Sequence, residues 1–195
     1  MKTGRLLSLN TALARPVSIN GRRVKTAIAK QPVDGERGVF TLGIEGDEQA
    51  DLSVHGGVGK AVYAYPSEHY AFWQTVRAQA KVALWDEPLA FGSIGENLTL
   101  EGVTEIDLWI GDVLQFPGCE LAVSEPRIPC FKLNAALGFA HAARLMTQSG
   151  WCGAYLAVRS PGTIAAGQPF TLRPGPREVG IVELFRARSG RATVA

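Results

Sequence analysis

The chain has 195 residues, of which 46% are hydrophobic and 19% charged, and its formal net charge at pH 7 is +2. This length suits one domain with a substantial core, and the composition is that of a folded protein rather than a disordered one. So small a net charge gives no reason to expect a nucleic acid polymer as a partner. Three cysteines, without CxxC or Cys/His metal spacing, argue against a disulfide scaffold and a structural zinc site.

The N-terminal segment lacks the pattern of a targeting sequence. Arg5, Asn10 and Arg15 interrupt it before an apolar signal-peptide core could form, and no later apolar run is long enough to cross a bilayer. We therefore expect a cytoplasmic protein with reduced cysteines and no membrane partner.

Short apolar runs bounded by turn-forming residues dominate the chain. The runs alternate or are rich in β-branched residues, so we expect each to form a strand. The expected strands are 6–10, 23–30, 38–44, 60–66, 97–102, 112–116, 120–126, 154–160 and 169–173.

Two segments have a helical pattern instead. Residues 67–84 place Tyr70, Trp73 and Leu84 on one face, with Ser67 in the N-cap position. Residues 134–150 have a similar pattern and stop at Gly150, a candidate left-handed C-cap.

The order of these elements predicts the fold class. The regular strand–helix alternation of a doubly wound sheet is missing. We therefore expect a mainly β protein, built as a closed or strongly coiled antiparallel barrel with helices packed on its outside or ends. Residues 173–195, with two prolines and a basic tail, are interpreted as a short C-terminal extension that could be helical.

Cations are concentrated near the N-terminus. They fit either a solvated strand face or a local anion site, and the residues alone leave both open. The five cations are Arg15, Arg22, Arg23, Lys25 and Lys30.

A polar stretch with the sequence "DLSVHGGVGK" places His55 directly before Gly56 and Gly57, and Lys60 follows. Glycines here allow positive φ angles and let a ligand approach backbone N–H groups closely. A tight hairpin with a surface histidine explains the same residues, so a binding turn is only one of two interpretations.

A second glycine-containing turn has the sequence "FGSIGENLTLEG". Gly92, Gly95, Glu96 and Asn97 surround a turn that leads into a predicted strand. Glycine and asparagine are favoured in turns for backbone reasons, and turn chemistry alone accounts for this stretch.

Cys130, in "SEPRIPCFKLN", has an unusual setting for a cysteine. Arg127 and Lys132 lie on either side of it, and a helical pattern begins within a few residues. Nearby cations and a helix N-terminus favour the thiolate form, which is the nucleophile and metal ligand. Cys119 and Cys152 lie in strand-like surroundings, and we interpret both as packing residues.

These motifs together resemble a known family. The "VHGG" turn followed by "YPSEHYAFW", the "GENL" turn followed by "GD" in "WIGDVLQF", and the Pro-Cys of "SEPRIPCFKLN" occur in the order typical of the MOSC domain, named for the C-terminal part of molybdenum cofactor sulfurases. The sequences of these motifs are especially similar to those of a stand-alone bacterial branch of the family. The resemblance covers residues 3–172 as one MOSC domain and leaves 173–195 as the extension.

The resemblance implies a fold, a cofactor and an activity. The fold would be a β-barrel similar to the pyruvate kinase barrel domain, and the cofactor would be the molybdenum cofactor (molybdopterin). The activity would be reduction of N-hydroxylated bases such as 6-N-hydroxylaminopurine. Its partners would be a small N-hydroxylated substrate and a separate electron-donor reductase. The donor would be needed because the chain has no flavin, haem, iron–sulfur or nicotinamide signature of its own. A homodimer is left open.

The resemblance also suggests roles for individual residues. Cys130, a soft donor, would coordinate molybdenum, and His55 would donate a proton when the N–O bond breaks. The expected cofactor-binding residues are Lys25, Thr26, Gly56, Gly57, Lys60, Asn97, Arg127 and Lys132, with Lys30 as a further cation.

The pattern of the predicted strand 23–30 gives Lys25 and Lys30 different surroundings. Lys25 points to the opposite side from Val24 and Thr26, whose side chains would form the apolar face. We predict that Lys25 faces the ligand, whereas Lys30, at the strand's end, extends to water.

Two other functions remain open at this point. The chain could carry the cofactor or its sulfur without turnover, or it could be a sulfur transferase in which Cys130 holds a persulfide.

Overall fold

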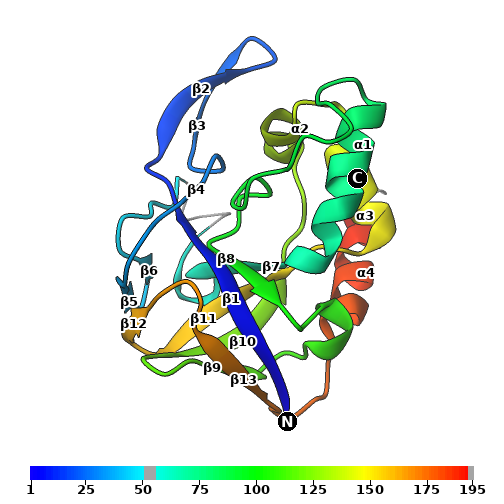
Figure 1. The fold of residues 1–195 in the computed structure, drawn as a ribbon. Helices are drawn as coiled ribbons and strands as arrows, with labels where there is room; N and C mark the ends of the chain where they lie inside the picture. The colour runs from blue at the N-terminus through cyan, green and yellow to red at the C-terminus, as the bar shows by residue number, and fades with distance from the viewer. Residues whose placement is uncertain (51–55, 193–195) are drawn as a thin grey trace.

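The computed structural model describes residues 1–50 and 56–192, and its main feature is a closed β-barrel (Figure 1). The barrel strands follow the order β1-β13-β9-β10-β11-β7-β8, and the pairing of β13 with β1 closes it. Neighbouring strands are antiparallel except β7 and β8, which are parallel. The barrel strands are β1 (Lys2–Thr11), β7 (Val62–Pro66), β8 (Leu98–Glu101), β9 (Val113–Gln115), β10 (Glu120–Pro126), β11 (Ala154–Ser160) and β13 (Pro169–Arg173). The predicted fold class, a mainly β closed barrel with helices around it, is confirmed.

Alternating apolar residues build the core. In β10, Leu121 and Val123 are buried while Ala122 between them is half-buried, as the period of two in a strand dictates. Leu6, Leu114 and Phe170 come from three other barrel strands and are almost fully buried in the same hydrophobic cluster. The barrel is therefore filled by side chains, as small barrels are.

A two-stranded hairpin projects from the barrel (Figure 1). It consists of β2 (Arg15–Ile19) and β3 (Arg22–Thr26), and Asn20 and Gly21 form its turn with positive φ angles, as tight hairpins require. The predicted strand 23–30 is therefore wrong beyond Thr26. The remaining short strands are β4 (Gln31–Pro32), β5 (Arg37–Phe40), β6 (Gly43–Ile44) and β12 (Gly162–Ile164).

The helices pack on the barrel's outside and at one end (Figure 1). The first predicted helix forms over a shorter range, and Ser67 is not its N-cap, because 67–69 make a 3-10 turn before the helix begins. The second segment divides into two helices at Gly138, which takes a left-handed conformation, and Gly150 is the expected left-handed C-cap. The helices are α1 (Tyr70–Gln79), α2 (Phe131–Leu137), α3 (Ala142–Ser149) and α4 (Ile181–Ala192).

The C-terminal segment is docked on the barrel rather than free. Ile181 and Phe185 of α4 are buried in the core cluster, and Arg188 forms an ion pair of 2.7 Å with Glu125 of β10. The residues after the last barrel strand therefore contribute to the same core as the barrel.

Candidate functional site

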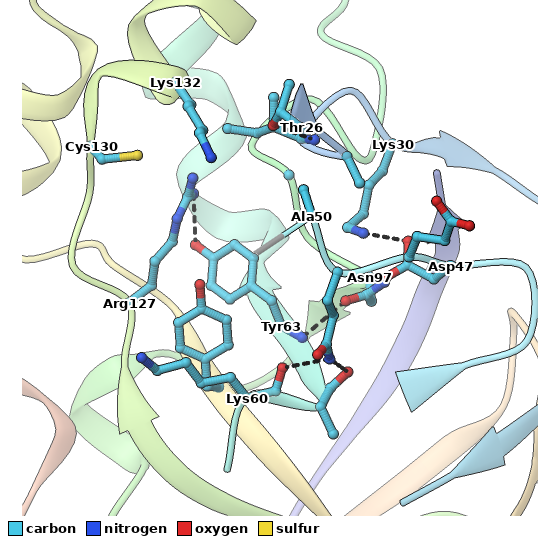
Figure 2. Close-up of a pocket in the computed structure, with 17 residues that line it drawn as sticks. Thr26, Lys30, Asp47, Ala50, Lys60, Tyr63, Asn97, Arg127, Cys130 and Lys132 are labelled. Carbon is cyan, nitrogen blue, oxygen red and sulfur yellow. Dashed lines mark hydrogen bonds and ion pairs between the residues drawn. The ribbon is translucent and has the colours of Figure 1, made fainter. Parts of the chain in front are cut away.

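A pocket opens at one end of the barrel, between the base of the hairpin and the start of α2 (Figure 2). It has about 640 Å³ of empty volume, its open mouth included. Its lining comes from segments 26–30, 47–50, 60–63, 95–97 and 127–132 and from Tyr155.

Cys130 lines this pocket directly before α2. Its backbone is extended, with φ −135° and ψ 176°, and the helix begins at the next residue. The helix thus starts three residues before the predicted 134, and the predicted position of Cys130 close to a helix N-terminus is confirmed. Figure 2 shows the Cys130 sulfur, the Lys132 amine and the Arg127 guanidinium pointing into the same space. The three residues that the sequence placed around the cysteine therefore share one cavity.

Arg127 is held in place by the barrel. Its side chain is only 6% exposed, donates to the carbonyl oxygen of Ile94 at 2.6 Å, and lies 4.9 Å from the centre of the Tyr63 ring. A buried guanidinium with one strong backbone bond and an aromatic face has little freedom to move. It places a fixed positive charge in the pocket wall.

Asn97 lines the pocket, but the scaffold uses its amide group. The side-chain oxygen accepts from the Tyr63 backbone N–H at 3.1 Å, and the side-chain nitrogen donates to the Asn10 carbonyl oxygen at 3.2 Å. These bonds join β7 to β1 across β8. Asn97 thus holds the wall together, and its predicted role in binding a ligand stays a prediction.

Lys30 lies in the pocket wall, contrary to the sequence-based expectation. It is 7% exposed and pairs with Asp47, which also accepts from the Ala12 backbone N–H (Figure 2). Burial lowers the pKa of Lys30, and the Asp47 carboxylate opposes that shift. The predicted exposure of Lys30 to water is wrong.

Lys25 is exposed and does not line this pocket. The predicted parity of β3 is correct, since Val24 and Thr26 share one face and Lys25 the other, but the buried face is the one that meets the pocket. Thr26 accordingly lines the cavity, as expected. Because the strand ends at Thr26, the following loop is free to bring Lys30 inward.

The turn that contains Gly92 and Gly95 packs closely against the loop that carries Lys30. Both glycines have positive φ, and a Cβ would lie 2.7 Å from the Lys30 carbonyl oxygen at Gly92 and 2.8 Å from Ile28 Cγ1 at Gly95. Only glycine allows so close an approach in this conformation. The turn therefore fixes the position of Lys30 as well as reversing the chain.

Glu96, between these glycines and Asn97, is fully buried. Its Oε1 accepts from Tyr70 Oη, from Thr99 Oγ1 at 2.8 Å and from the Gly92 N–H at 2.7 Å, while Oε2 has no hydrogen-bond partner among the described residues. Burial raises the pKa of this carboxyl, with the three donors opposing the shift. The Glu96 network lies behind the pocket wall and was not predicted from the sequence.

The histidine–glycine turn is only partly described. His55 lies outside the described residues. Gly57 donates its N–H to Gln49 Oε1 at 3.0 Å, and neither Gly56 nor Gly57 lines the pocket, so the structure does not support the predicted contact of these amides with a ligand. Lys60 lines the pocket, 3.9 Å from a Glu125 oxygen.

The other two cysteines are core residues, as predicted. Cys119 and Cys152 are 4% and 0% exposed. Burial raises the pKa of Cys119 to about 11 and that of Cys152 well above its usual value. Both therefore remain neutral thiols at physiological pH.

Sequence reasoning missed two aromatic residues of the pocket. Tyr63 and Tyr155 are directly paired across β7 and β11, and their ring centres lie 5.3 Å apart. The strands carrying them were predicted, but their pairing was not, and the pairing is what puts both rings at the pocket. Asp47 was missed for the same reason, since its role depends on the distant Lys30.

A family comparison agrees with the fold: the chain belongs to the MOSC domain family, whose model matches residues 51–171. Within that family the chain is 38% identical to Protein YiiM of Escherichia coli (strain K12) over 158 residues, covering 81% of this chain and 68% of that protein. It is 36% identical to the uncharacterized protein YflK of Bacillus subtilis (strain 168) over 162 residues, covering 83% and 70%. A protein of Gibberella moniliformis (strain M3125 / FGSC 7600) named "Reductase" is 32% identical over 193 residues, which are 96% of this chain but 33% of that protein.

Solved structures show the same similarity. The crystal structure of YiiM from Geobacillus stearothermophilus matches with a TM-score of 0.74 and 28% identity, covering 96% of this chain and 85% of that one. The crystal structure of YiiM from Escherichia coli matches with a TM-score of 0.67 and 28% identity, covering 93% and 75%. The chain is thus similar to YiiM proteins in both sequence and fold.

Within the described part of the chain, no helix combines the length and the apolar character that crossing a membrane requires.

Proposed function

We propose that this pocket binds a molybdenum cofactor and that the protein is an oxidoreductase that reduces N-hydroxylated bases. The observation that carries the proposal is that Cys130 shares one pocket with four cations, which are Lys30, Lys60, Arg127 and Lys132. A pocket with a thiol and several positive charges suits a ligand that is both metallic and anionic. The family is associated with the molybdenum cofactor, and one relative is named a reductase.

The residues present fit this cofactor. The Cys130 thiolate would be the soft ligand to the metal. Arg127 and Lys30, both fixed by bonds to the scaffold, would neutralise negative charge, and Lys60 and Lys132, which also line the pocket, would add positive charge. The rings of Tyr63 and Tyr155 would form one wall and exclude water there.

The reaction itself balances as an N–O bond cleavage. R–NH–OH takes up two electrons and two protons and gives R–NH₂ and water. The cofactor, when bound, supplies the two-electron chemistry. The chain's own residues bind and orient the substrate, and His55 remains our predicted proton donor. The electrons come from a separate reductase, and we place the protein in the cytoplasm with that partner.

Metal analysis and a defined electron donor test the proposal. Protein purified from a host that makes molybdenum cofactor should contain stoichiometric molybdenum, and it should reduce 6-N-hydroxylaminopurine to adenine with dithionite-reduced methyl viologen. Molybdenum without turnover would indicate a carrier instead. Cyanide-releasable sulfur on Cys130 without molybdenum would indicate the persulfide transferase.

A further inference from the structure

The hairpin of β2 and β3, here called the basic arm (residues 15–26), carries four cations and no acidic residue. No aspartate or glutamate precedes Asp34 in the sequence. In the described part of the chain, none of the arm's cations takes part in an ion pair. These exposed cations are Arg15, Arg22, Arg23 and Lys25.

The two faces of the basic arm differ. On one face Ile19 and Thr26 are buried, and this face carries the contact with the rest of the molecule. On the other face Arg23 and Lys25 are exposed together with Ser18 and Pro16, their partners in the register. The first face therefore anchors the arm and also carries Arg15 and Arg22, the register partners of Thr26 and Ile19. The second face presents Arg23 and Lys25 to the solvent.

The arm stands beside the mouth of the pocket. Thr26, its last residue, lines the cavity, and Lys132 at the start of α2 lines it too. Figure 1 shows the arm and α2 at the same end of the barrel, and Figure 2 shows Thr26 and Lys132 near each other. A protein bound to the arm would therefore lie over the entrance to the proposed reaction site.

We propose that the basic arm is the docking element for the acidic surface of a flavin-bearing electron-transfer protein. This inference rests on the proposed function, which requires two electrons from outside the chain for each N–O bond cleaved. Two reduced flavins would each be oxidised by one electron per turnover, with two protons taken up from the solvent. Exposed cations that form no ion pair attract an acidic partner from a distance and orient it at contact.

The composition of the arm favours a protein over a nucleic acid. Residues 12–30 contain no aromatic residue on which a base could stack. The exposed face is also short, since each of its strands has five residues. A small acidic patch on a protein matches such a surface better than an extended polyanion.

A charge-reversal variant tests the proposal with a flavodoxin, reduced by its NADPH-dependent reductase, as the acidic donor. Arg22→Glu/Arg23→Glu changes exposed side chains near the tip of the arm and leaves the pocket residues intact. In the cofactor-loaded protein, we expect the flavodoxin concentration for half-maximal rate to rise at least about tenfold at low salt, with little change in kcat. The difference should shrink to less than about threefold near 0.5 M salt, because salt screens exposed charges.

The matched control is Arg144→Glu/Arg186→Glu, which changes the net charge equally but lies on α3 and α4, away from the arm (Figure 1). It should leave flavodoxin kinetics within about twofold of the wild type. Both variants should keep the wild-type rate with reduced methyl viologen, a small donor that needs no docking surface. Equal effects of the two variants would overturn the proposal, as would wild-type turnover with methyl viologen but not with flavodoxin.

Direct binding separates this inference from the proposed function. Titration of oxidised flavodoxin with the wild type and the two variants at low salt requires no turnover. Loss of binding only in the arm variant would support the docking surface even if 6-N-hydroxylaminopurine were not reduced. Binding of a single-stranded oligonucleotide to the arm more tightly than of flavodoxin would refute it.

Discussion

The two sides of the pocket are built differently. On the barrel side, Tyr63, Asn97 and Arg127 are buried, and each is hydrogen-bonded to the backbone of another segment. On the α2 side, Cys130 and Lys132 are partly exposed, and among the described residues neither side chain makes a hydrogen bond or ion pair. The barrel therefore fixes the shape of the site and one positive charge, while the start of α2 presents groups that are free to react or bind.

This contrast separates two kinds of substitution. A change on the α2 side removes no hydrogen bond or ion pair among the described residues, so it should affect binding and activity much more than stability. A change on the barrel side removes contacts that also hold the strands together, so it should lower both. The predictions below test this division.

The largest expected effect is that of Cys130→Ser. A hydroxyl is a harder and far less acidic donor than a thiol, so we expect molybdenum retention and activity to be lost. The thermal midpoint should stay within about 2 °C of the wild type, since no hydrogen bond is removed. Metal analysis and thermal denaturation measure both.

Cys119→Ser and Cys152→Ser are the controls for Cys130. Each puts a hydroxyl into the core, so each should lower stability by about 1–3 kcal/mol while keeping activity per folded molecule. Full activity of Cys130→Ser would refute the assignment of this cysteine.

Arg127→Met should lower both stability and cofactor retention. It leaves the Ile94 carbonyl oxygen without its donor, at a cost of about 1–3 kcal/mol, and it removes the fixed charge. Urea denaturation and molybdenum content give the two readouts. Arg144→Met, at an exposed position on α3, should change neither. If Arg127→Met were as stable as the wild type but lacked cofactor, Arg127 would affect binding alone, as we expect of the residues on the α2 side.

Lys30 and Lys25 exchange the roles that the sequence suggested. Losing one charge-assisted hydrogen bond should weaken cofactor binding by about 1.5–3 kcal/mol, or roughly ten- to a hundredfold, for Lys30→Met. Lys25→Met should lose less than about 1 kcal/mol, as an exposed charge does. The molybdenum that the Lys30→Met and Lys25→Met variants each retain over a dilution series measures the difference.

The Lys30→Met variant needs a control for stability, because it leaves the Asp47 carboxylate buried without the lysine that pairs with it. Lys30→Met/Asp47→Asn removes both charges. If the double variant recovers stability but not cofactor, the lysine acts on the ligand. If it recovers both, Lys30 serves only to neutralise Asp47.

The sequence predicted the architecture better than it predicted the pocket. Alternating apolar residues fix each strand locally, which is why β10 and β11 were placed at their observed bounds. Cys130 was found because its prolines, its cations and its helix start are neighbours in the chain. Lys30 was misplaced because the strand ends at Thr26, and its partner Asp47 and the supporting glycines lie 17 or more residues away. Such contacts depend on strand pairing, which local patterns do not specify.

The smallest expected effect concerns Glu96, which lies behind the barrel side and does not line the pocket. Burial raises its pKa above the usual 4.5, so the folded state holds the proton more tightly than the unfolded state. Its contribution to stability is therefore fully present below the unfolded pKa and is lost as pH rises through the folded pKa.

Glu96→Gln does not titrate, so its free energy of unfolding should improve relative to the wild type between pH 4 and pH 8. The gain should be about 1.4 kcal/mol for each unit by which burial raises the pKa. Urea denaturation across this range measures it. The exposed Glu101→Gln, on strand β8 just after Glu96, is the control for removing a carboxylate. A constant difference between Glu96→Gln and the wild type would mean that the three donors on Oε1 compensate the burial fully. Molybdenum content should not change in either case, because the network supports the wall from outside the site.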